Sequence, residues 1–473
     1  MKNRRPIAML WLATLLAVVL GGCAAGFSRE SMTAPPFAAW IQKPLPSLEL
    51  LSIDSLALRP YAARFEAVEK LPDGSMMLAY SSDGLRVFAR LLVPSSPAPA
   101  LGHPVVIFSH GWVGLEGSKT YTFLAGKESA EQILVNGLRD AGFAVLVVGF
   151  RGHGSVAGRD AEGSEEIVRW DNSSYLSPVF YAIDVLNALA GMDSLNDLGP
   201  LRQSGDAATR LINQKHVFVS GHSQGGDVAL MAMAVSNSHP ALRHRFLGGS
   251  IWSGCFGPRF EQLELYGPMA SSPAAFLSGD GRWHASRLSP DGRSNPDFRF
   301  AYPPDWIGDP DPANWSWQKN TWKTPLVFTV LSDRYAQLHE VLAKNLAGPA
   351  FGETTLFQDG AGRTQAKHAP TLEAAMKMVG AYHAPQRLLR PFNLHFSDRD
   401  YYSPPDWNIG LAAKVNALGG NASAFQYPGN THSLGVSNHA WFSPPGTTPG
   451  LPKMLKHDID LFRHLAEMSG TNR

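Results

Sequence analysis

Residues 216–230 read HVFVSGHSQGGDVAL, an apolar run that ends in Gly-His-Ser-Gln-Gly-Gly and continues with helix-forming residues. Gly221, Ser223 and Gly225 match G-x-S-x-G, a pattern that is weak alone because the chain has 45 glycines. Its position between a β-rich run and a helical run is the setting in which a tight, strained turn projects a serine from the top of a sheet. We therefore predict that Ser223 is a nucleophile; the alternative is a glycine-rich turn without chemistry.

Strands alternate with helical patterns on both sides of this turn. Buried-strand patterns occur at 103–111, 143–154, 245–255 and 390–400, and helical patterns at 128–142, 177–192, 407–418 and 453–468. This alternation predicts an α/β protein with a mostly parallel sheet and helices on both of its faces. Before it, residues 64–94 carry two Asp-Gly turns between alternating apolar residues, which predicts successive β-hairpins.

The regular alternation breaks between residues 258 and 390. This segment holds the Pro-rich run YPPDWIGDPDPANWSW and five tryptophans: Trp283, Trp306, Trp315, Trp317 and Trp322. We predict a Trp- and Pro-rich insertion at 258–390, between a first core part at 64–257 and a second at 391–473. The insertion is expected to be a lid or wall of an apolar pocket; a packing domain or a partner-binding surface is the alternative.

A serine nucleophile needs a general base, and the base needs an orienting acid. Asp400 follows the strand pattern of NLHFSDRD, and ligands bind beyond the carboxyl ends of strands in such sheets. His432 lies in the loop YPGNTHSLG, 32 residues later, after one helical and one strand pattern. This spacing lets both residues reach the edge where Ser223 lies, so we predict Asp400 as the acid and His432 as the base.

Other acids and bases remain open from the sequence. Asp398 is an alternative to Asp400, because it lies in the same short loop. A rival pair, Asp333 and His368, repeats the pattern of strand, acid, helix, strand and histidine less cleanly.

A tetrahedral intermediate needs two backbone N–H donors. Gln224 is expected to supply one, because it follows the nucleophile at the start of a helix. The loop SHGWVG after the strand at 103–109 is expected to supply the other, from Trp112 or, failing that, from Gly111. His153 in FRGHG is expected to structure its loop rather than to contact substrate.

Taken together, SHG, FRGHG, GHSQGG, FSDRD and GNTHS resemble the α/β-hydrolase superfamily, most nearly its dienelactone hydrolase and prolyl-oligopeptidase-like branch. The resemblance covers about 64–255 and 388–466. It implies the α/β-hydrolase fold, with Ser223, Asp400 and His432 as nucleophile, acid and base. The chain departs from the family pattern at the acid loop and at the oxyanion donor. Ser397 precedes the acid loop where many members have Gly, and Trp112 stands where many members have the second Gly of HGG. The chain also leaves no room for the propeller of the prolyl oligopeptidases proper.

The N-terminus resembles a bacterial lipoprotein signal. Lys2, Arg4 and Arg5 precede an apolar run that ends in LGGC, with Cys23 as the residue to be lipidated. We predict a signal peptide at 1–22, a Pro-, Ala- and Ser-rich tether at 23–63, and a lipid anchor in the cell envelope. Ala24 favours the outer membrane of a Gram-negative bacterium; an ordinary signal peptide, with Cys23 incidental, is the alternative.

The composition excludes few classes of protein. The chain has 473 residues, a formal net charge of +1 and two cysteines, so a lipidated Cys23 would leave Cys255 without a disulfide partner. The near-neutral charge gives no reason to expect nucleic acid as a partner. No metal-ligand spacing and no phosphate-binding glycine motif occurs, so we predict neither a metal nor a cofactor.

The leading functional hypothesis is a serine hydrolase of small carboxylic esters that forms an acyl-enzyme on Ser223. An exopeptidase or amidase acting on short peptides is the second hypothesis, for which Glu165 and Glu166 are a weak candidate anchor of a substrate amine. A non-catalytic envelope protein that uses the fold as a binding scaffold is the third.

Overall fold

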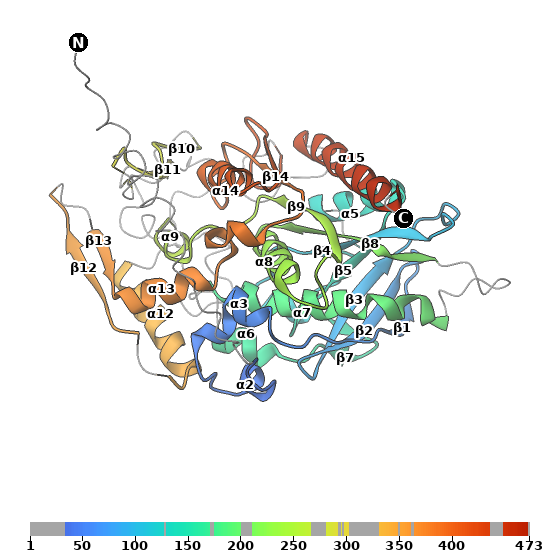
Figure 1. Ribbon diagram of the computed structural model, residues 1–473, viewed down its shortest axis with the longest axis horizontal. Coiled ribbons are helices and arrows are strands. Elements are labelled where there is room, and N and C mark those ends of the chain that lie inside the picture. Colours follow the sequence, from blue (N-terminus) through green and yellow to red (C-terminus); the bar gives the residue numbers. More distant parts are fainter. Residues whose placement is uncertain are drawn as a thin grey trace, which may run out of the picture. The chain divides into compact units, whose positions relative to one another are not determined.

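A nine-stranded sheet organises the part of the chain that the structure describes (Figure 1). The computed structural model describes residues 34–126, 129–170, 175–199, 211–265, 281–291, 295, 298–301, 331–348, 351–360, 364–435 and 448–471. Across the sheet the strands are β1 (Glu66–Lys70), β2 (Met76–Ser82), β3 (Leu85–Leu92), β5 (Ala144–Val148), β4 (His103–Ser109), β8 (Ile212–His222), β9 (Phe246–Trp252), β14 (Phe392–Phe396) and β15 (Ala422–Gln426).

The strand order and direction identify the fold. β1, β2, β3 and β5 pair in antiparallel fashion, whereas every neighbouring pair from β5 to β15 is parallel. The chain enters the parallel part at β4, steps back to β5 and then proceeds outward through β8, β9, β14 and β15. This is the arrangement of the α/β-hydrolase fold, as the sequence predicted.

The two Asp-Gly turns form the predicted hairpins. Gly74 (φ 82°) turns the chain between β1 and β2, and Gly84 (φ 84°) turns it between β2 and β3. Asp83, just before Gly84, also has a positive φ of 56°, a region that Asp tolerates better than most residues. Turn chemistry therefore sets the register of the antiparallel part.

Helices cover both faces of the sheet (Figure 1). One face carries α7 (Ser177–Gly191), α8 (Gln224–Ser238) and α14 (Pro405–Ala417), and the other carries α5 (Ala130–Asp140) and α15 (Gly450–Thr471). Strand β4 shows why: Val105 and Ile107 join one hydrophobic cluster, while Val106 and Phe108 join the other. Successive side chains of a strand point to opposite faces, so a strand covered on both faces must be apolar throughout.

The prediction of a tether at 23–63 is wrong from residue 36 onward. Residues 36–63 belong to the same compact unit as the rest of the described chain, and they form α2 (Ala38–Ile41), the short 3₁₀-helix at Leu48–Leu51 and α3 (Ile53–Leu56). Several apolar side chains of this segment are buried in the hydrophobic cluster that also contains side chains of α7 and α8, among them Trp40, Leu45, Leu48, Leu51, Ile53 and Leu56. The Pro- and Ser-rich composition concealed an apolar pattern, because Ser47 and Ser52 are here helix caps.

The insertion at 258–390 packs on the sheet domain where it is described. It includes α9 (Arg259–Leu265), β10 (Arg282–His284), β11 (Arg299–Ala301), α12 (Leu331–Asn345), β12 (Thr354–Gln358), β13 (Thr364–His368) and α13 (Pro370–Met378). Leu338, Leu342 and Leu372 share the cluster of α7 and α8. Trp306, Trp315, Trp317 and Trp322 lie outside the described residues.

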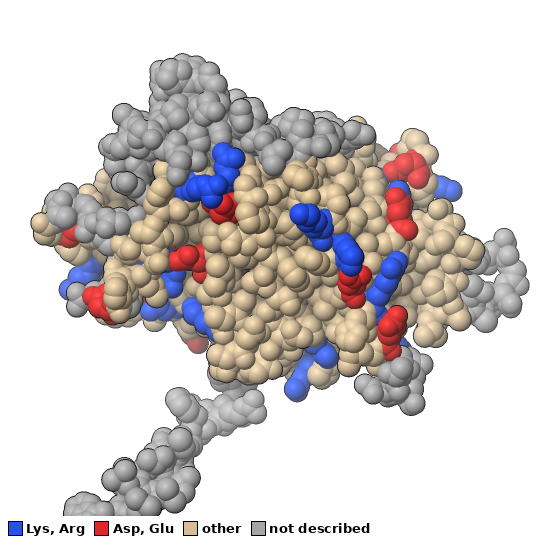
Figure 2. Space-filling view, turned by 90° about the horizontal axis from the view of Figure 1, so that it is seen from above, with Lys and Arg blue, Asp and Glu red and all other residues tan. Residues whose placement is uncertain are grey.

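The remaining short elements are α4 (Leu115–Lys119), β6 (Ser155–Val156), β7 (Arg159–Asp160) and α6 (Ser164–Trp170), together with 3₁₀-helices at Met192–Asp197, Ala381–His383 and Pro385–Arg387. Charged side chains of both signs are interspersed on the face that Figure 2 shows. Among the residues described, no helix combines the length and the apolar character needed to cross a bilayer. The predicted signal peptide and Cys23 lie outside the described residues.

Candidate active site

Ser223 lies on a strained turn between β8 and α8. Its backbone angles, φ 56° and ψ −123°, are rare for any residue other than glycine. Three main-chain hydrogen bonds hold the turn: the Ser223 N–H donates to Trp252 O at 2.9 Å, and Ser223 O accepts from Gly226 N at 2.9 Å and Cys255 N at 3.0 Å. The strain is therefore stabilised from β9 on one side and from α8 on the other.

The flanking glycines are required because main chains approach closely. A Cβ atom on Gly221 would lie 2.0 Å from Gly225 O, and one on Gly225 would lie 2.1 Å from Ser109 O. Neither contact could be relieved by rotating a side chain, since both involve backbone atoms. The G-x-S-x-G pattern thus reflects how tightly α8 is packed against the ends of β4 and β8.

Asp400 and His432 form a buried pair at the same edge of the sheet. His432 Nδ1 lies 2.9 Å from each carboxylate oxygen of Asp400, whose side chain is fully buried. Asp400 Oδ1 also accepts hydrogen bonds from Tyr402 N at 2.9 Å and Ser403 N at 3.2 Å. An ionised Asp400 held in this way makes Nδ1 the protonated nitrogen of His432, which leaves Nε2 able to accept a proton.

This pair lies beside the turn that carries Ser223. The ring of His432 is 4.9 Å from the ring of His222, the residue before Ser223, and 5.1 Å from the ring of Tyr402. The Ser223 hydroxyl itself is partly exposed, and its Oγ lies 3.7 Å from Cys255 Sγ. The predicted nucleophile, acid and base therefore gather at one edge, where the parallel strands end.

The alternative acids have other partners. Asp398 pairs with Arg282 and accepts a hydrogen bond from Gly429 N at 2.7 Å. Asp333 lies in the first turn of α12, and His368 stacks on Phe260 at 3.7 Å. The contact between Asp400 and His432 favours that pair over both alternatives.

Gln224 and residues 110–112 after β4, called the oxyanion loop for their expected role, lie beside Ser223. Gln224 is the first residue of α8, whose positive N-terminal end faces the nucleophile turn. A Cβ on Gly111 would lie 3.3 Å from Ser223 Cβ, so this loop contacts the turn that carries Ser223. The Gly111 N–H, however, donates to Glu131 Oε1 at 2.8 Å, which argues against Gly111 as the donor and agrees with the sequence-based preference for Trp112.

Sequence reasoning missed Glu131 and His222 altogether. Glu131 Oε1 also lies 2.7 Å from His222 Nδ1, so one carboxylate joins the oxyanion loop to the nucleophile turn. Burial alone would raise the pKa of Glu131, but the hydrogen bond from His222 and that from Gly111 bring this pKa below its usual value. Burial lowers the pKa of His222, which favours the neutral form of its ring. The position of His222 within GHSQG was the one available signal.

The FRGHG loop packs beneath the oxyanion loop through aromatic rings. His110 stacks on Phe150 at 4.3 Å and lies 5.2 Å from His153. Burial lowers the pKa of His110 to about 4 and that of His153 to about 3, so both rings are neutral near pH 7. His153 Nδ1 lies 3.0 Å from Arg151 O, which agrees with the structural role that the sequence suggested for it.

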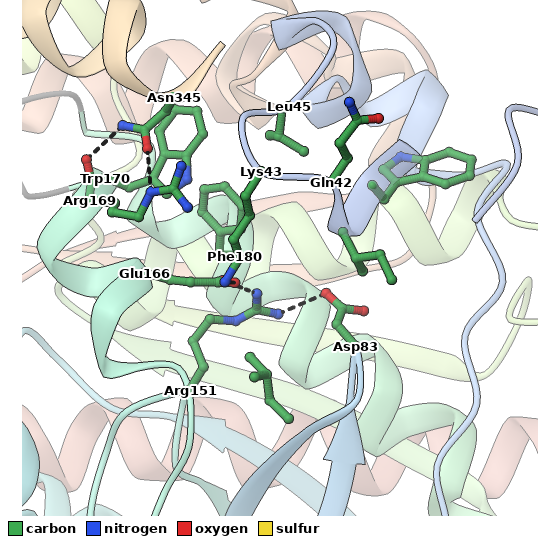
Figure 3. A pocket seen from close by; sticks show the side chains of 13 residues that line it. Gln42, Lys43, Leu45, Asp83, Arg151, Glu166, Arg169, Trp170, Phe180 and Asn345 are labelled. Carbon is green, nitrogen blue, oxygen red and sulfur yellow. Dashed lines mark hydrogen bonds and ion pairs between the residues drawn. The ribbon is translucent and has the colours of Figure 1, made fainter. Parts of the chain in front are cut away.

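Glu166 lines a separate pocket of about 200 Å³ (Figure 3), and both Glu166 and its neighbour Glu165 are already paired. Lys43 Nζ lies 3.4 Å from Glu165 and 2.9 Å from Glu166, and Arg151 Nη1 lies 2.6 Å from Glu166. Arg151 also binds the buried Asp184 at 2.8 Å. Both carboxylates of the candidate amine anchor thus already pair with cations of the chain itself.

The insertion contacts the loop that carries the acid. Trp283 Nε1 donates to Asp400 O at 2.6 Å, and the Trp283 ring stacks on Tyr401 with centroids 6.2 Å apart. Within the described ranges, no cluster of His, Cys, Asp or Glu is arranged to hold a metal ion.

No protein-family model matches the chain, and no curated protein sequence matches it. Solved structures of similar topology include Est1E from Butyrivibrio proteoclasticus with bound ferulic acid, at 13% identity and a TM-score of 0.39, covering 81% of this chain and 98% of that one. A puromycin-hydrolyzing peptidase of Mycobacterium tuberculosis has 13% identity and a TM-score of 0.43, covering 86% of this chain and 40% of that one. Esterase Est2 of the planctomycete Thermogutta terrifontis has 12% identity and a TM-score of 0.38, covering 85% and 92%.

Proposed function

We propose that the chain is a serine hydrolase that cleaves small carboxylic esters through an acyl-enzyme on Ser223. The observation that carries the proposal is the buried pair of Asp400 and His432 beside the strained turn of Ser223. A protein that only bound ligands would have no need of a strained serine, a buried carboxylate and an oriented imidazole at one edge.

The geometry suggests the following reaction. Rotation of the Ser223 hydroxyl away from Cys255 brings it toward His432 Nε2, which removes its proton as the oxygen attacks the ester carbonyl. The N–H groups of Gln224 and Trp112 bind the oxyanion that develops. His432 then protonates the leaving alcohol, and the acyl group remains on Ser223.

Deacylation uses the same groups. A water molecule gives its proton to His432 Nε2 and attacks the acyl carbon, and the carboxylic acid leaves as Ser223 regains its proton. Throughout, Asp400 stabilises the imidazolium form of His432 without itself taking up a proton. No step requires a metal or a cofactor.

Ester substrates are favoured over peptides because Glu165 and Glu166, the candidate anchor of a substrate amine, are already paired within the chain. An exopeptidase that binds a free amino terminus needs an unneutralised anion, yet Lys43 and Arg151 already pair with these carboxylates. We further propose that the insertion at 258–390 forms a wall of the acyl pocket, because Trp283 contacts the acid loop.

The deciding experiment compares the full chain with Ser223→Ala. The chain, purified in mild detergent, is assayed on p-nitrophenyl esters of graded acyl length and on aminoacyl and prolyl anilides. We expect ester turnover that is lost in Ser223→Ala, together with labelling of the unsubstituted chain alone by a fluorophosphonate. Faster turnover of anilides would indicate a peptidase, and the absence of both turnover and labelling would indicate a scaffold.

We also propose that the chain is anchored to the outer membrane through a lipid on Cys23. The support is the LGGC sequence after the apolar N-terminal run. Metabolic labelling with an alkyne analogue of palmitate should mark the chain and fail to mark Cys23→Ser. Equal labelling of both would refute the anchor.

A further inference from the structure

We propose that Glu131 is a positioning residue that aims the oxyanion loop and joins it to the nucleophile turn. The inference rests on the proposed function, because it assigns Trp112 N–H to the oxyanion. Glu131 comes from the first turn of α5, 20 positions beyond Gly111 and 91 positions before His222. Its Oε1 atom accepts from Gly111 N at 2.8 Å and from His222 Nδ1 at 2.7 Å.

The direction of the Trp112 amide follows from the two peptide groups that flank Gly111. Glu131 accepts a hydrogen bond from the Gly111 N–H and so fixes the peptide group before Gly111. His110 Nδ1 donates to Gly111 O at 2.7 Å and so fixes the peptide group between Gly111 and Trp112. The C=O and N–H of a trans peptide point in opposite directions. With Gly111 O held toward His110, the Trp112 N–H is aimed away from His110.

Glycine at position 111 is part of the same arrangement. A Cβ atom there would lie 3.1 Å from Glu131 Oε1, 3.3 Å from His222 Nδ1 and 3.3 Å from Ser223 Cβ. Real Cβ atoms rarely have neighbours that close, so a side chain at Gly111 would push the loop away from Glu131 or from the nucleophile. The loop, the carboxylate and the turn are therefore packed as one unit.

His222 extends this unit to the general base. Its ring stacks on Trp252 at 3.9 Å on one side and lies 4.9 Å from the ring of His432. The side chains of Glu131 and His222 are only 16% and 10% exposed, so the hydrogen bond between them is protected from competing water. Glu131 thus constrains a loop, a turn and a ring that all border the reacting atoms.

A positioning role and a purely structural role predict different kinetics. An oxyanion donor acts on the transition state, so a misaimed donor lowers kcat and leaves KM nearly unchanged. Complete loss of one such donor costs about 100- to 1,000-fold in kcat. We expect Glu131→Ala to lower kcat by roughly 30- to 300-fold, a partial form of that loss. It should weaken binding of a trifluoromethyl ketone, which forms a tetrahedral adduct, by a similar factor.

Glu131→Gln is the conservative variant. Its amide oxygen can accept both hydrogen bonds, so we expect kcat within about fivefold of the unsubstituted chain. Asp458→Asn is the matched control, because Asp458 is another buried carboxylate that binds a histidine, His395 Nε2 at 2.9 Å, and also Ser250 Oγ at 2.7 Å. It contacts neither Gly111 nor His222, so it should lower the melting temperature without a selective loss of kcat.

Three kinetic results would overturn the proposal: kcat of Glu131→Ala within threefold of the unsubstituted chain, no recovery in Glu131→Gln, or an equal kcat loss in Asp458→Asn. A crystal structure of Glu131→Ala gives a test that needs no turnover. Residues 110–112 should leave the path seen here, and an unchanged path would overturn the proposal. If the unsubstituted chain turns over no ester and resists fluorophosphonate labelling, the proposed function fails. The crystal structure of Glu131→Ala then decides by itself whether Glu131 holds the loop.

Discussion

Replacement of Asp400 by Asn tests the acid assignment most directly, because the contacts of this side chain determine what the amide must do. The carboxylate lies 2.9 Å from His432 Nδ1 through both oxygens, and its Oδ1 also accepts from Tyr402 N and Ser403 N. An Asn side chain has one acceptor oxygen and one NH₂ group. If the oxygen keeps the two backbone donors, the NH₂ group must face His432 Nδ1.

That orientation produces the wrong tautomer of His432. Nδ1 must then accept a hydrogen bond, so the proton moves to Nε2, which can no longer take the proton of Ser223. The flipped amide would restore the tautomer but lose two buried hydrogen bonds, at about 1 kcal/mol each or more. A difference of about 2 kcal/mol leaves roughly one molecule in 30 in the active arrangement, since 1.4 kcal/mol corresponds to a factor of ten.

Loss of the negative charge beside the imidazolium adds to this effect. The same change in another Ser-His-Asp triad lowers kcat about 10⁴-fold, equivalent to about 5 kcal/mol. We expect Asp400→Asn to lower kcat by roughly 10³- to 10⁴-fold with little change in KM, measured on the best p-nitrophenyl ester. The melting temperature should change little, because the residue keeps its volume and two of its hydrogen bonds.

Asp398→Asn is the matched control two positions away. Its oxygen can still accept from Gly429 N, so kcat is expected to stay within about threefold of the unsubstituted chain. A variant Asp400→Asn that retains more than a tenth of the original kcat would refute the acid assignment. So would a larger loss in Asp398→Asn than in Asp400→Asn.

Two further predictions concern packing and pH. Gly225→Ala should abolish ester turnover and destabilise the fold by about 3 kcal/mol or more in urea unfolding, because its Cβ would lie 2.1 Å from Ser109 O. Gly199→Ala is the control, because the space around its Cβ is open, and it should change the free energy of unfolding by less than about 1 kcal/mol. Equal effects of the two substitutions would contradict this account. Burial lowers the pKa of His110 to about 4 and that of His153 to about 3, so below the ordinary value of about 6.5 the unfolded chain binds protons that the folded chain does not. The stability that these two rings contribute is fully present above that value and is lost as the pH falls toward 4. Lowering the pH from 7.5 to 5.5 should therefore reduce the free energy of unfolding by about 1.3 kcal/mol for each of the two rings. The double variant His110→Asn, His153→Asn should show a weaker pH dependence of this free energy. An unchanged dependence would refute the assignment of the loss to these rings.

Much of the fold followed from local patterns in the sequence. The apolar runs at β4, β5 and β14 predicted buried parallel strands, and the Asp-Gly pairs predicted hairpins, because each pattern acts through neighbouring residues. The prediction of a tether failed at residues 36–63 for the opposite reason. Trp40 and Leu48 are buried in the hydrophobic cluster that also contains side chains of α7 and α8, and nothing within the segment shows that this partner surface exists.

The same division runs through the candidate site. The sequence alone predicted the tight, strained turn at Ser223, because the two glycines and the strand and helix around Ser223 are contiguous in the chain. It predicted that Asp400 and His432 reach the edge where Ser223 lies, but it left Asp398 open, since two carboxylates in one loop differ only in where they point. Tertiary structure decided that Asp400 faces His432. It also brought Glu131 between Gly111 and His222, a contact across 91 positions that depends on how α5 packs against the ends of β4 and β8. Spacing along the chain carries no information about such a contact, because it forms only when separate elements meet in the folded core.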